Sequence, residues 1–107
     1  MKNHLKIIKE LKSLLVNKLG QDIRDVILYG SQIKGTNDQE SDYDILIVLN
    51  RKYNWVQRRI IRDLSYEVSL KYDIIIDSKI ISLEELENSP TGNHPLYLDA
   101  LTQGVYA

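Results

Sequence analysis

Two aspartates, Asp42 and Asp44, stand at the start of an apolar run, and Gly30-Ser31 ends the apolar run before it, with ten residues in between. Residues two apart on a β-strand project to the same face, about 6.6 Å from each other, so both carboxylates can approach one cation. Proteins commonly hold Mg²⁺ with one or two carboxylates plus substrate phosphates. The aspartate pair therefore predicts phosphoryl or nucleotidyl chemistry.

The Gly30-Ser31 pair is predicted to hold the phosphates of such a substrate. A glycine lets a phosphate approach the backbone closely, and the amides around Ser31, together with its hydroxyl, can donate hydrogen bonds to it. Lys34 adds a positive charge nearby. In isolation a Gly-Ser pair after a strand is only a turn, so the spacing to Asp42 carries the interpretation.

A third carboxylate is expected on a neighbouring strand, where it can bind a second cation and take the proton of an attacking hydroxyl. Asp73 and Asp77 bracket the apolar run Ile74-Ile75-Ile76 and share one strand face, so alternation alone does not choose between them. A parallel strand crossover that places Asp73 level with Asp44 favours Asp73. Both can also be ordinary acids at the ends of a strand.

The elements that must position these residues follow from hydrophobic periodicity. Apolar residues three or four apart predict helices over residues 4–19 and 54–70, and short apolar runs predict strands over 26–29, 44–49 and 73–77. A helical turn over 31–35 and a loop over 36–41 join the first two strands. In the second helix, Arg58, Arg59 and Arg62 form a basic face that is open to solvent, to a partner or to a triphosphate.

The last quarter of the chain is predicted to be helical. Ser82 and Glu85 have the spacing of a capping box, which begins a short helix that stops before Pro90. Residues 91–94 form a loop, and Pro95 starts a final helix that Gly104 ends. The expected fold is α/β (α+β), a small mixed sheet flanked by helices, in one domain over residues 1–107.

Length and composition exclude several classes of function. The chain has 107 residues, no cysteine and a net charge of −1, so it lacks thiolate chemistry and an overall field for binding nucleic acid directly. Its longest apolar run, Ile45–Leu49, is far shorter than the ~18 residues of a membrane span. We expect a cytoplasmic protein without membrane contact.

The motifs resemble those of the nucleotidyltransferase superfamily with the DNA polymerase β fold, in which Gly-Ser is followed after about ten residues by Asp-x-Asp. The likeness extends over most of the chain and is greatest to the minimal nucleotidyltransferases of the MntA type. The segments that carry it are Leu28-Tyr29-Gly30-Ser31, Lys34-Gly35, Ser41-Asp42-Tyr43-Asp44-Ile45-Leu46 and residues 96–104. Lys34 stands where arginine is commoner, and Ile75 stands where some relatives have an acid.

This resemblance implies a polymerase-β-like fold and an adenylyltransferase that uses Mg·ATP. It also implies an antitoxin paired with a HEPN ribonuclease toxin, which it adenylylates on a tyrosine. Residue by residue, it places Gly30 and Ser31 on the phosphates with Lys34 beside them. Asp42 and Asp44 would bind two Mg²⁺ ions, and Asp73 would be the third carboxylate.

Two other functions remain open. The chain can be an antitoxin that keeps the fold but inhibits its partner by contact alone, which loss of the third carboxylate would favour. It can also be a small-molecule nucleotidyltransferase, similar to the enzymes that modify antibiotics, in a homo-oligomer whose second subunit completes the acceptor pocket.

Overall fold

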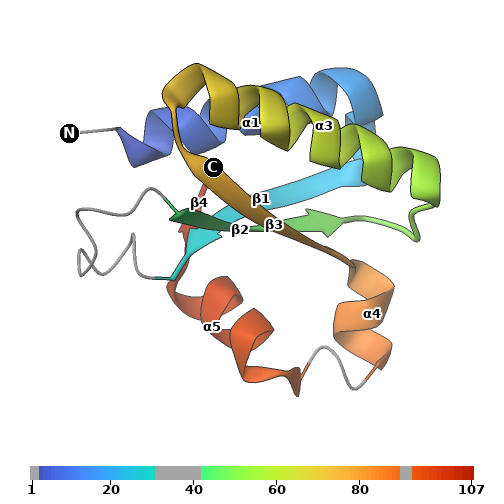
Figure 1. Ribbon diagram of the computed structural model, residues 1–107. Helices are drawn as coiled ribbons and strands as arrows, with labels where there is room; N and C mark the ends of the chain where they lie inside the picture. Colours follow the sequence, from blue (N-terminus) through green and yellow to red (C-terminus); the bar gives the residue numbers. More distant parts are fainter. Residues whose placement is uncertain (1–2, 31–41, 90–92) are drawn as a thin grey trace.

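The computed structural model describes residues 3–30, 42–89 and 93–107, and within them a four-stranded sheet carries helices on both faces (Figure 1). The sheet consists of β1 (Ile23–Tyr29), β2 (Asp42–Leu49), β3 (Ile75–Ser82) and β4 (Val105–Tyr106), in the order β3-β2-β1-β4. β2 pairs with β1 antiparallel and with β3 parallel. The predicted mixed sheet is confirmed, and Ser31 and Lys34 lie outside the described residues.

One face of the sheet is covered by α1 (His4–Leu19) and α3 (Trp55–Tyr72), as Figure 1 shows. Both helices were expected from periodicity, and both have side-chain caps. Asn3 accepts a hydrogen bond from the Lys6 amide, and Asn54 forms a capping box with Gln57. α1 ends before Gly20, whose φ of +59° is the left-handed conformation that glycine adopts without strain.

The opposite face is covered by two shorter helices, α4 (Leu83–Asn88) and α5 (Pro95–Gln103). Ser82 caps α4 through the predicted capping box with Glu85, and Gly104 follows the last residue of α5. The chain then returns to the sheet as β4, which pairs with β1 and was not predicted. A two-residue strand has no periodicity, so only its partner defines it.

β2 is buried on both faces, as its continuous apolar sequence predicted. Tyr43, Ile45, Ile47 and Leu49 join the core under α1 and α3, whereas Leu46 and Val48 join the core under α4 and α5. Since successive side chains alternate, Asp42 and Asp44 belong to the second face. No helix in the described parts of the chain is both long and apolar enough to cross a membrane.

Candidate active site

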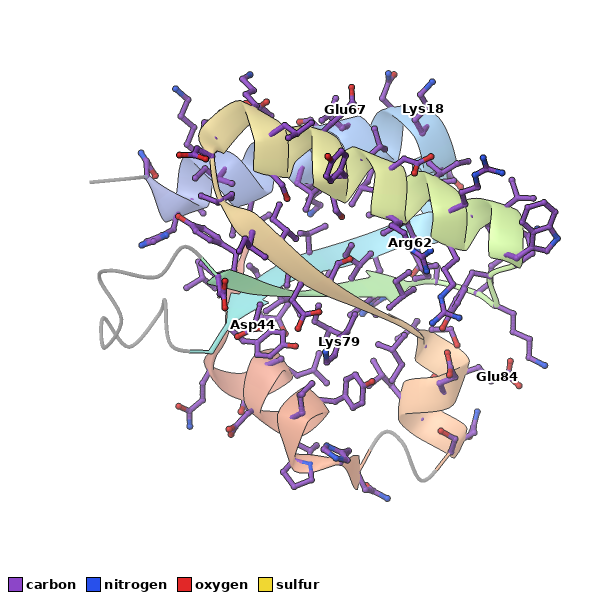
Figure 2. All side chains as sticks on the ribbon, viewed as in Figure 1. Lys18, Asp44, Arg62, Glu67, Lys79 and Glu84 are labelled. Carbon is purple, nitrogen blue, oxygen red and sulfur yellow. The ribbon has the colours of Figure 1, made fainter. Side chains whose placement is uncertain are left out.

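Asp42 and Asp44 lie at the beginning of β2 on the face that α5 partly covers, and Figure 2 shows Asp44 pointing to that side. Between them, Tyr43 is buried on the other face, where its hydroxyl lies 2.7 Å from Nδ1 of His4. This buried tyrosine fixes the register of the strand's first residues. As a result, both aspartates lie on the face opposite Tyr43, as the alternation predicted, and this face is the one away from α1 and α3.

The third carboxylate beside this pair is Asp77. In the parallel register of β2 and β3, Asp44 lies opposite Asp77, while Asp42 lies opposite Ile75. Directly paired residues of neighbouring strands share a face, so Asp42, Asp44 and Asp77 form one group, which we call the carboxylate cluster. The cluster faces solvent at Asp42 and Asp77 and is half-buried at Asp44.

The expectation that Asp73 lies level with Asp44 is wrong. α3 continues to Tyr72, two residues past its predicted end, and Asp73 then reverses the chain with φ +54° and ψ +52°. The amides of Asp73 and Ile74 both donate to the carbonyl of Ser69, which closes the helix and delays the strand to Ile75. The longer helix therefore moves Asp77 into the position that Asp73 was expected to take.

The charges of the cluster act on Asp44. Burial raises the pKa of Asp44, the negative charges of Asp77 and Asp42 raise it further, and Lys79 lowers it. Nζ of Lys79 lies 3.4 Å from Oδ2 of Asp77 and supplies the only ion pair that the described residues make with the cluster. Carboxylates that repel one another in this way favour a bound cation.

Gly30 lies directly against the cluster. Its φ is +88°, and a β-carbon at this position would lie 2.5 Å from Oδ2 of Asp44. Any larger residue would therefore push the carboxylate aside. The structure brings Gly30 and Asp44 together, whereas the phosphate-binding role of Gly30 stays a prediction, as do the roles of Ser31 and Lys34, which fall outside the described residues.

The residues present suit Mg²⁺ with a nucleotide rather than an ion held by protein alone. All three candidate ligands are carboxylates, which provide the hard oxygen atoms that Mg²⁺ prefers. Yet the described residues contain no group of three or more His, Cys, Asp or Glu that could hold a metal ion. Coordination completed by substrate phosphates fits both observations.

Tyr29 is a site residue to which the sequence assigned no role. It lies opposite Asp44 in the register of β1 and β2, and its buried hydroxyl has no hydrogen-bond partner among the described residues. Burial, followed by the charges of Asp44 and Asp77, raises its pKa to about 12, so the hydroxyl stays protonated. A buried donor without a partner beside carboxylates is typical of a functional position.

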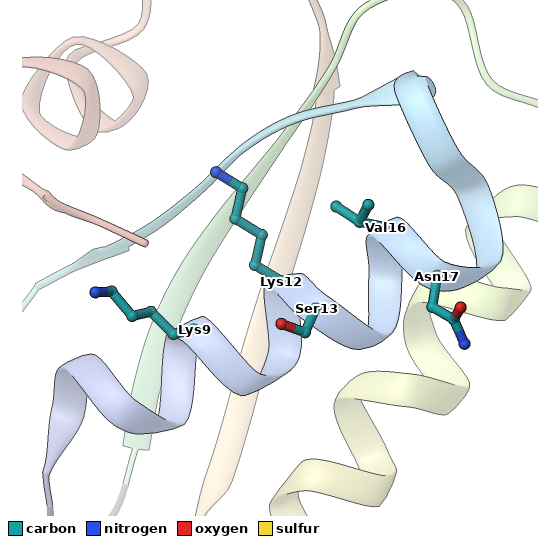
Figure 3. Close-up of a pocket in the computed structure, with 5 residues that line it drawn as sticks. All are labelled: Lys9, Lys12, Ser13, Val16 and Asn17. Carbon is teal, nitrogen blue, oxygen red and sulfur yellow. The ribbon is translucent and has the colours of Figure 1, made fainter.

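Two hollows in the described surface differ in their position relative to the cluster. The larger, about 510 Å³, lies on the outer side of α1 and is lined by Lys9, Lys12, Ser13, Val16 and Asn17 (Figure 3). It belongs to the helix that covers the other face of the sheet. The second, about 320 Å³, is lined by Lys79, which pairs with Asp77, and by Arg58, Arg62, Ser78, Ile80 and Tyr97. Of these two, the second adjoins the carboxylate cluster.

Comparison with known proteins agrees with this geometry. Residues 2–96 match the family described as the nucleotidyltransferase domain. Two relatives from Methanocaldococcus jannaschii, both provisionally named as protein adenylyltransferases, are 36% identical over 85 residues and 35% identical over 102 residues. The first alignment covers 79% of this chain and 85% of the relative, and the second covers 95% of each.

Solved structures share the fold. A toxin–antitoxin crystal structure with AMP-PNP has a TM-score of 0.58 and 23% identity, over 98% of this chain and 72% of that chain. A MntA-HepT toxin–antitoxin structure has a TM-score of 0.52 and 18% identity, over 97% and 70%. At these identities the likeness concerns the fold, and it confirms the expected architecture.

Proposed function

Because the chain belongs to the nucleotidyltransferase domain family, we propose that it transfers AMP from ATP to a hydroxyl group, the side chain of a tyrosine in a partner protein. The partner in this proposal is a HEPN-type toxin, which makes the chain an antitoxin. One observation carries the proposal, the meeting of Gly30, Asp44 and Asp77 at one end of the sheet: Gly30 leaves no room for a side chain beside Asp44, which lies opposite Asp77 in the register.

The relatives support the acceptor class and the donor. The two Methanocaldococcus proteins carry names that specify adenylyl transfer to protein. Structures with the same fold include a toxin–antitoxin with AMP-PNP, an analogue of ATP. A separate partner protein is therefore the acceptor we propose.

The carboxylate cluster would hold two Mg²⁺ ions, for which Asp42, Asp44 and Asp77 supply oxygen ligands. When bound, such ions neutralise charge that develops on the α-phosphate and hold the attacking and leaving oxygens in line. The register favours Asp77 over Asp73 as the third carboxylate. We propose that Asp77 accepts the proton of the acceptor hydroxyl as its oxygen bonds to the α-phosphorus and the bond to pyrophosphate breaks.

The segment that follows β1 would hold the leaving group. Gly30 leaves the backbone open to a phosphate, and the proposal assigns the Ser31 hydroxyl and the Lys34 ammonium to the β- and γ-phosphates. The Tyr29 hydroxyl, without a described partner, can donate to the same ligand. These groups bind and orient the triphosphate, so that only the α-phosphate faces the acceptor.

A second function is favoured by one observation. Since no three acidic or histidine side chains of the described residues could hold a metal by themselves, the chain can also act by contact, binding a toxin without modifying it. In that case Asp42 and Asp44 are dispensable for inhibition. Inhibition of the toxin by an Asp42→Ala, Asp44→Ala double variant therefore distinguishes the two functions.

The deciding experiment incubates the purified protein with Mg²⁺, ATP labelled at the α-phosphate and a lysate of its source cells. The Asp42→Ala, Asp44→Ala double variant is run beside it, with Asp63→Ala, Glu67→Ala as a control that removes two exposed acids from α3. Label on a partner protein with wild type and control, but not with the cluster variant, supports transfer. Absence of label in a lysate that contains the partner contradicts it and leaves binding by contact.

A further inference from the structure

The hollow beside the carboxylate cluster lies along β3, which is an edge strand of the sheet within the described residues. We call this hollow the β3 groove. Its volume is about 320 Å³, and its lining is mostly polar, with Ser78 and Lys79 from β3, Arg58 and Arg62 from α3, and Tyr97 from α5. Figure 2 shows Lys79 and Asp44 on the side of the sheet that α5 covers, and Arg62 on α3 above the β3 edge.

The groove carries positive charge that the rest of the described chain does not neutralise. Arg58 and Arg62 are exposed, and no described residue forms an ion pair with either of them. Lys79 is already paired with Asp77. Two neighbouring guanidinium groups in a polar hollow are suited to carboxylates or phosphates, which arginine binds with parallel hydrogen bonds.

The position of the groove assigns it to the acceptor, an argument that rests on the proposed function. In-line transfer places the attacking oxygen and the leaving pyrophosphate on opposite sides of the α-phosphate. Gly30, beside which the phosphates are expected, follows β1 and lies next to Asp44 on that side of β2. Asp77 lies next to Asp44 on the other side of β2, in β3. The acceptor must then approach from the β3 side, across the groove.

The spacing of the charges specifies the shape of the ligand. Residues four apart on a helix, such as Arg58 and Arg62, have β-carbons about 5–6 Å apart. In an extended peptide, side chains two residues apart lie on one side at about 6.6 Å, which is a close match. β3 is an edge strand of the described sheet, so its outer backbone groups can pair with an extended peptide, although the carbonyl of Ile80 already accepts a hydrogen bond from the Tyr53 hydroxyl at 3.2 Å.

We propose that the β3 groove binds an extended acidic peptide segment of the acceptor protein, with carboxylates at alternate positions on Arg58 and Arg62. The segment presents its hydroxyl residue to Asp77. Ile75, which is 62% exposed next to the cluster, provides an apolar contact for the ring of an acceptor tyrosine. A peptide is favoured over RNA, because the chain has a net charge of −1 and two arginines neutralise few phosphates.

Binding is tested with the full chain and three fluorescent peptides that contain one tyrosine and, at alternate positions around it, glutamate, glutamine or lysine. Anisotropy is measured without nucleotide, so that it does not depend on transfer. The Arg58→Gln, Arg62→Gln variant is compared with Arg59→Gln, Lys18→Gln, which loses the same two charges outside the groove. Circular dichroism confirms that each variant is folded.

We expect the glutamate peptide to bind best and the groove variant to lose about tenfold in affinity, while the control variant loses less than about twofold. Arg58→Glu, Arg62→Glu should prefer the lysine peptide. Equal binding of all three peptides, no saturable binding up to about 1 mM, equal losses in both glutamine variants or tighter binding of a single-stranded RNA would each overturn the assignment.

The same peptides separate this inference from the proposed function. With Mg²⁺ and labelled ATP, transfer to tyrosine peptides irrespective of their charge would contradict the groove and leave the nucleotidyl transfer intact. Binding of the glutamate peptide through Arg58 and Arg62, without transfer to it or to any partner protein, would contradict the transfer and leave the groove intact.

Discussion

Substitution of Gly30 by alanine tests whether the glycine positions the carboxylate cluster. The added β-carbon would lie 2.5 Å from Oδ2, 3.3 Å from Cγ and 3.4 Å from Cβ of Asp44. Ordinary contacts begin at about 3.4 Å, so the carboxylate oxygen must move by roughly 0.9 Å, the difference between 3.4 and 2.5 Å. The carboxylate is the free end of a short side chain, so its rotation relieves the contact and leaves the strand in place.

Two different costs follow from this geometry. Alanine at a positive φ loses about 1–2 kcal/mol of folding free energy, a fraction of the roughly 5–15 kcal/mol that stabilises a domain, so the variant stays folded. A catalytic group displaced by ~1 Å can lower the rate about 10²-fold. We therefore expect the AMP transfer rate of Gly30→Ala to fall about 100-fold. The small loss of stability does not explain this fall, because the variant stays folded.

Gly20→Ala is the matched control for this prediction. Gly20 also has a positive φ, +59°, but a β-carbon added there would have no atom within 4 Å. Both variants should lose similar free energy of unfolding in urea, whereas only Gly30→Ala should lose AMP transfer, measured with ATP labelled at the α-phosphate. If Gly30→Ala transfers AMP within about threefold of Gly20→Ala, the contact with Asp44 does not position the cluster.

Four further substitutions separate the roles of individual side chains. Asp77→Asn should lower AMP transfer by orders of magnitude. Asp73→Asn should leave it nearly unchanged, because asparagine tolerates the left-handed conformation of this position; equal losses in both variants would contradict the register argument. Tyr29→Phe removes a buried hydroxyl that has no partner among the described residues, so thermal unfolding should show a protein about 1 kcal/mol more stable, and the KM for ATP should rise. A less stable variant would mean that the hydroxyl is hydrogen-bonded in the free protein. Hydrogen bonds from Lys71 and then Tyr72 lower the pKa of Glu10 in the folded protein. Ionised Glu10 therefore stabilises the fold above the ordinary pKa of a glutamate, and this stabilisation is lost as the pH falls through the lowered pKa. Glu10→Gln should therefore be less stable than wild type at about pH 7 but equal to it in strong acid, and a difference that persists there would refute this linkage.

Much of the fold was predictable from the sequence because its signals are local. Both long helices have apolar residues at helical spacing, and the capping box of Ser82 with Glu85 marks where α4 begins. β4 gave no such signal, since its two residues become a strand only by pairing with Ile27 and Leu28. Strand pairing depends on tertiary contacts, and a short window of sequence does not contain them.

The carboxylate cluster was predictable in part, and its third member depended on where a helix ends. Alternation placed Asp73 and Asp77 on one face, but the register depends on the end of α3. The helix ends at an aspartate in the left-handed conformation, where glycine is the usual signal. Tyr29, next to Gly30, was assigned no role for another reason, because a buried hydroxyl without a partner among the described residues is visible only when its surroundings are known.

The cluster also explains how a small apolar sheet can hold a charged centre. On the face that carries Asp44, the following residues Leu46 and Val48 are fully buried, so the charges are confined to one end of the strands. Burial and like charges disfavour the ionised form of Asp44, which means that the free protein carries an electrostatic cost at this end. A cation that binds there removes this cost, so ligand binding must stabilise the folded state. The repulsion between Asp44 and Asp77, which Lys79 offsets in part, would therefore add to the affinity of the cluster for a cation.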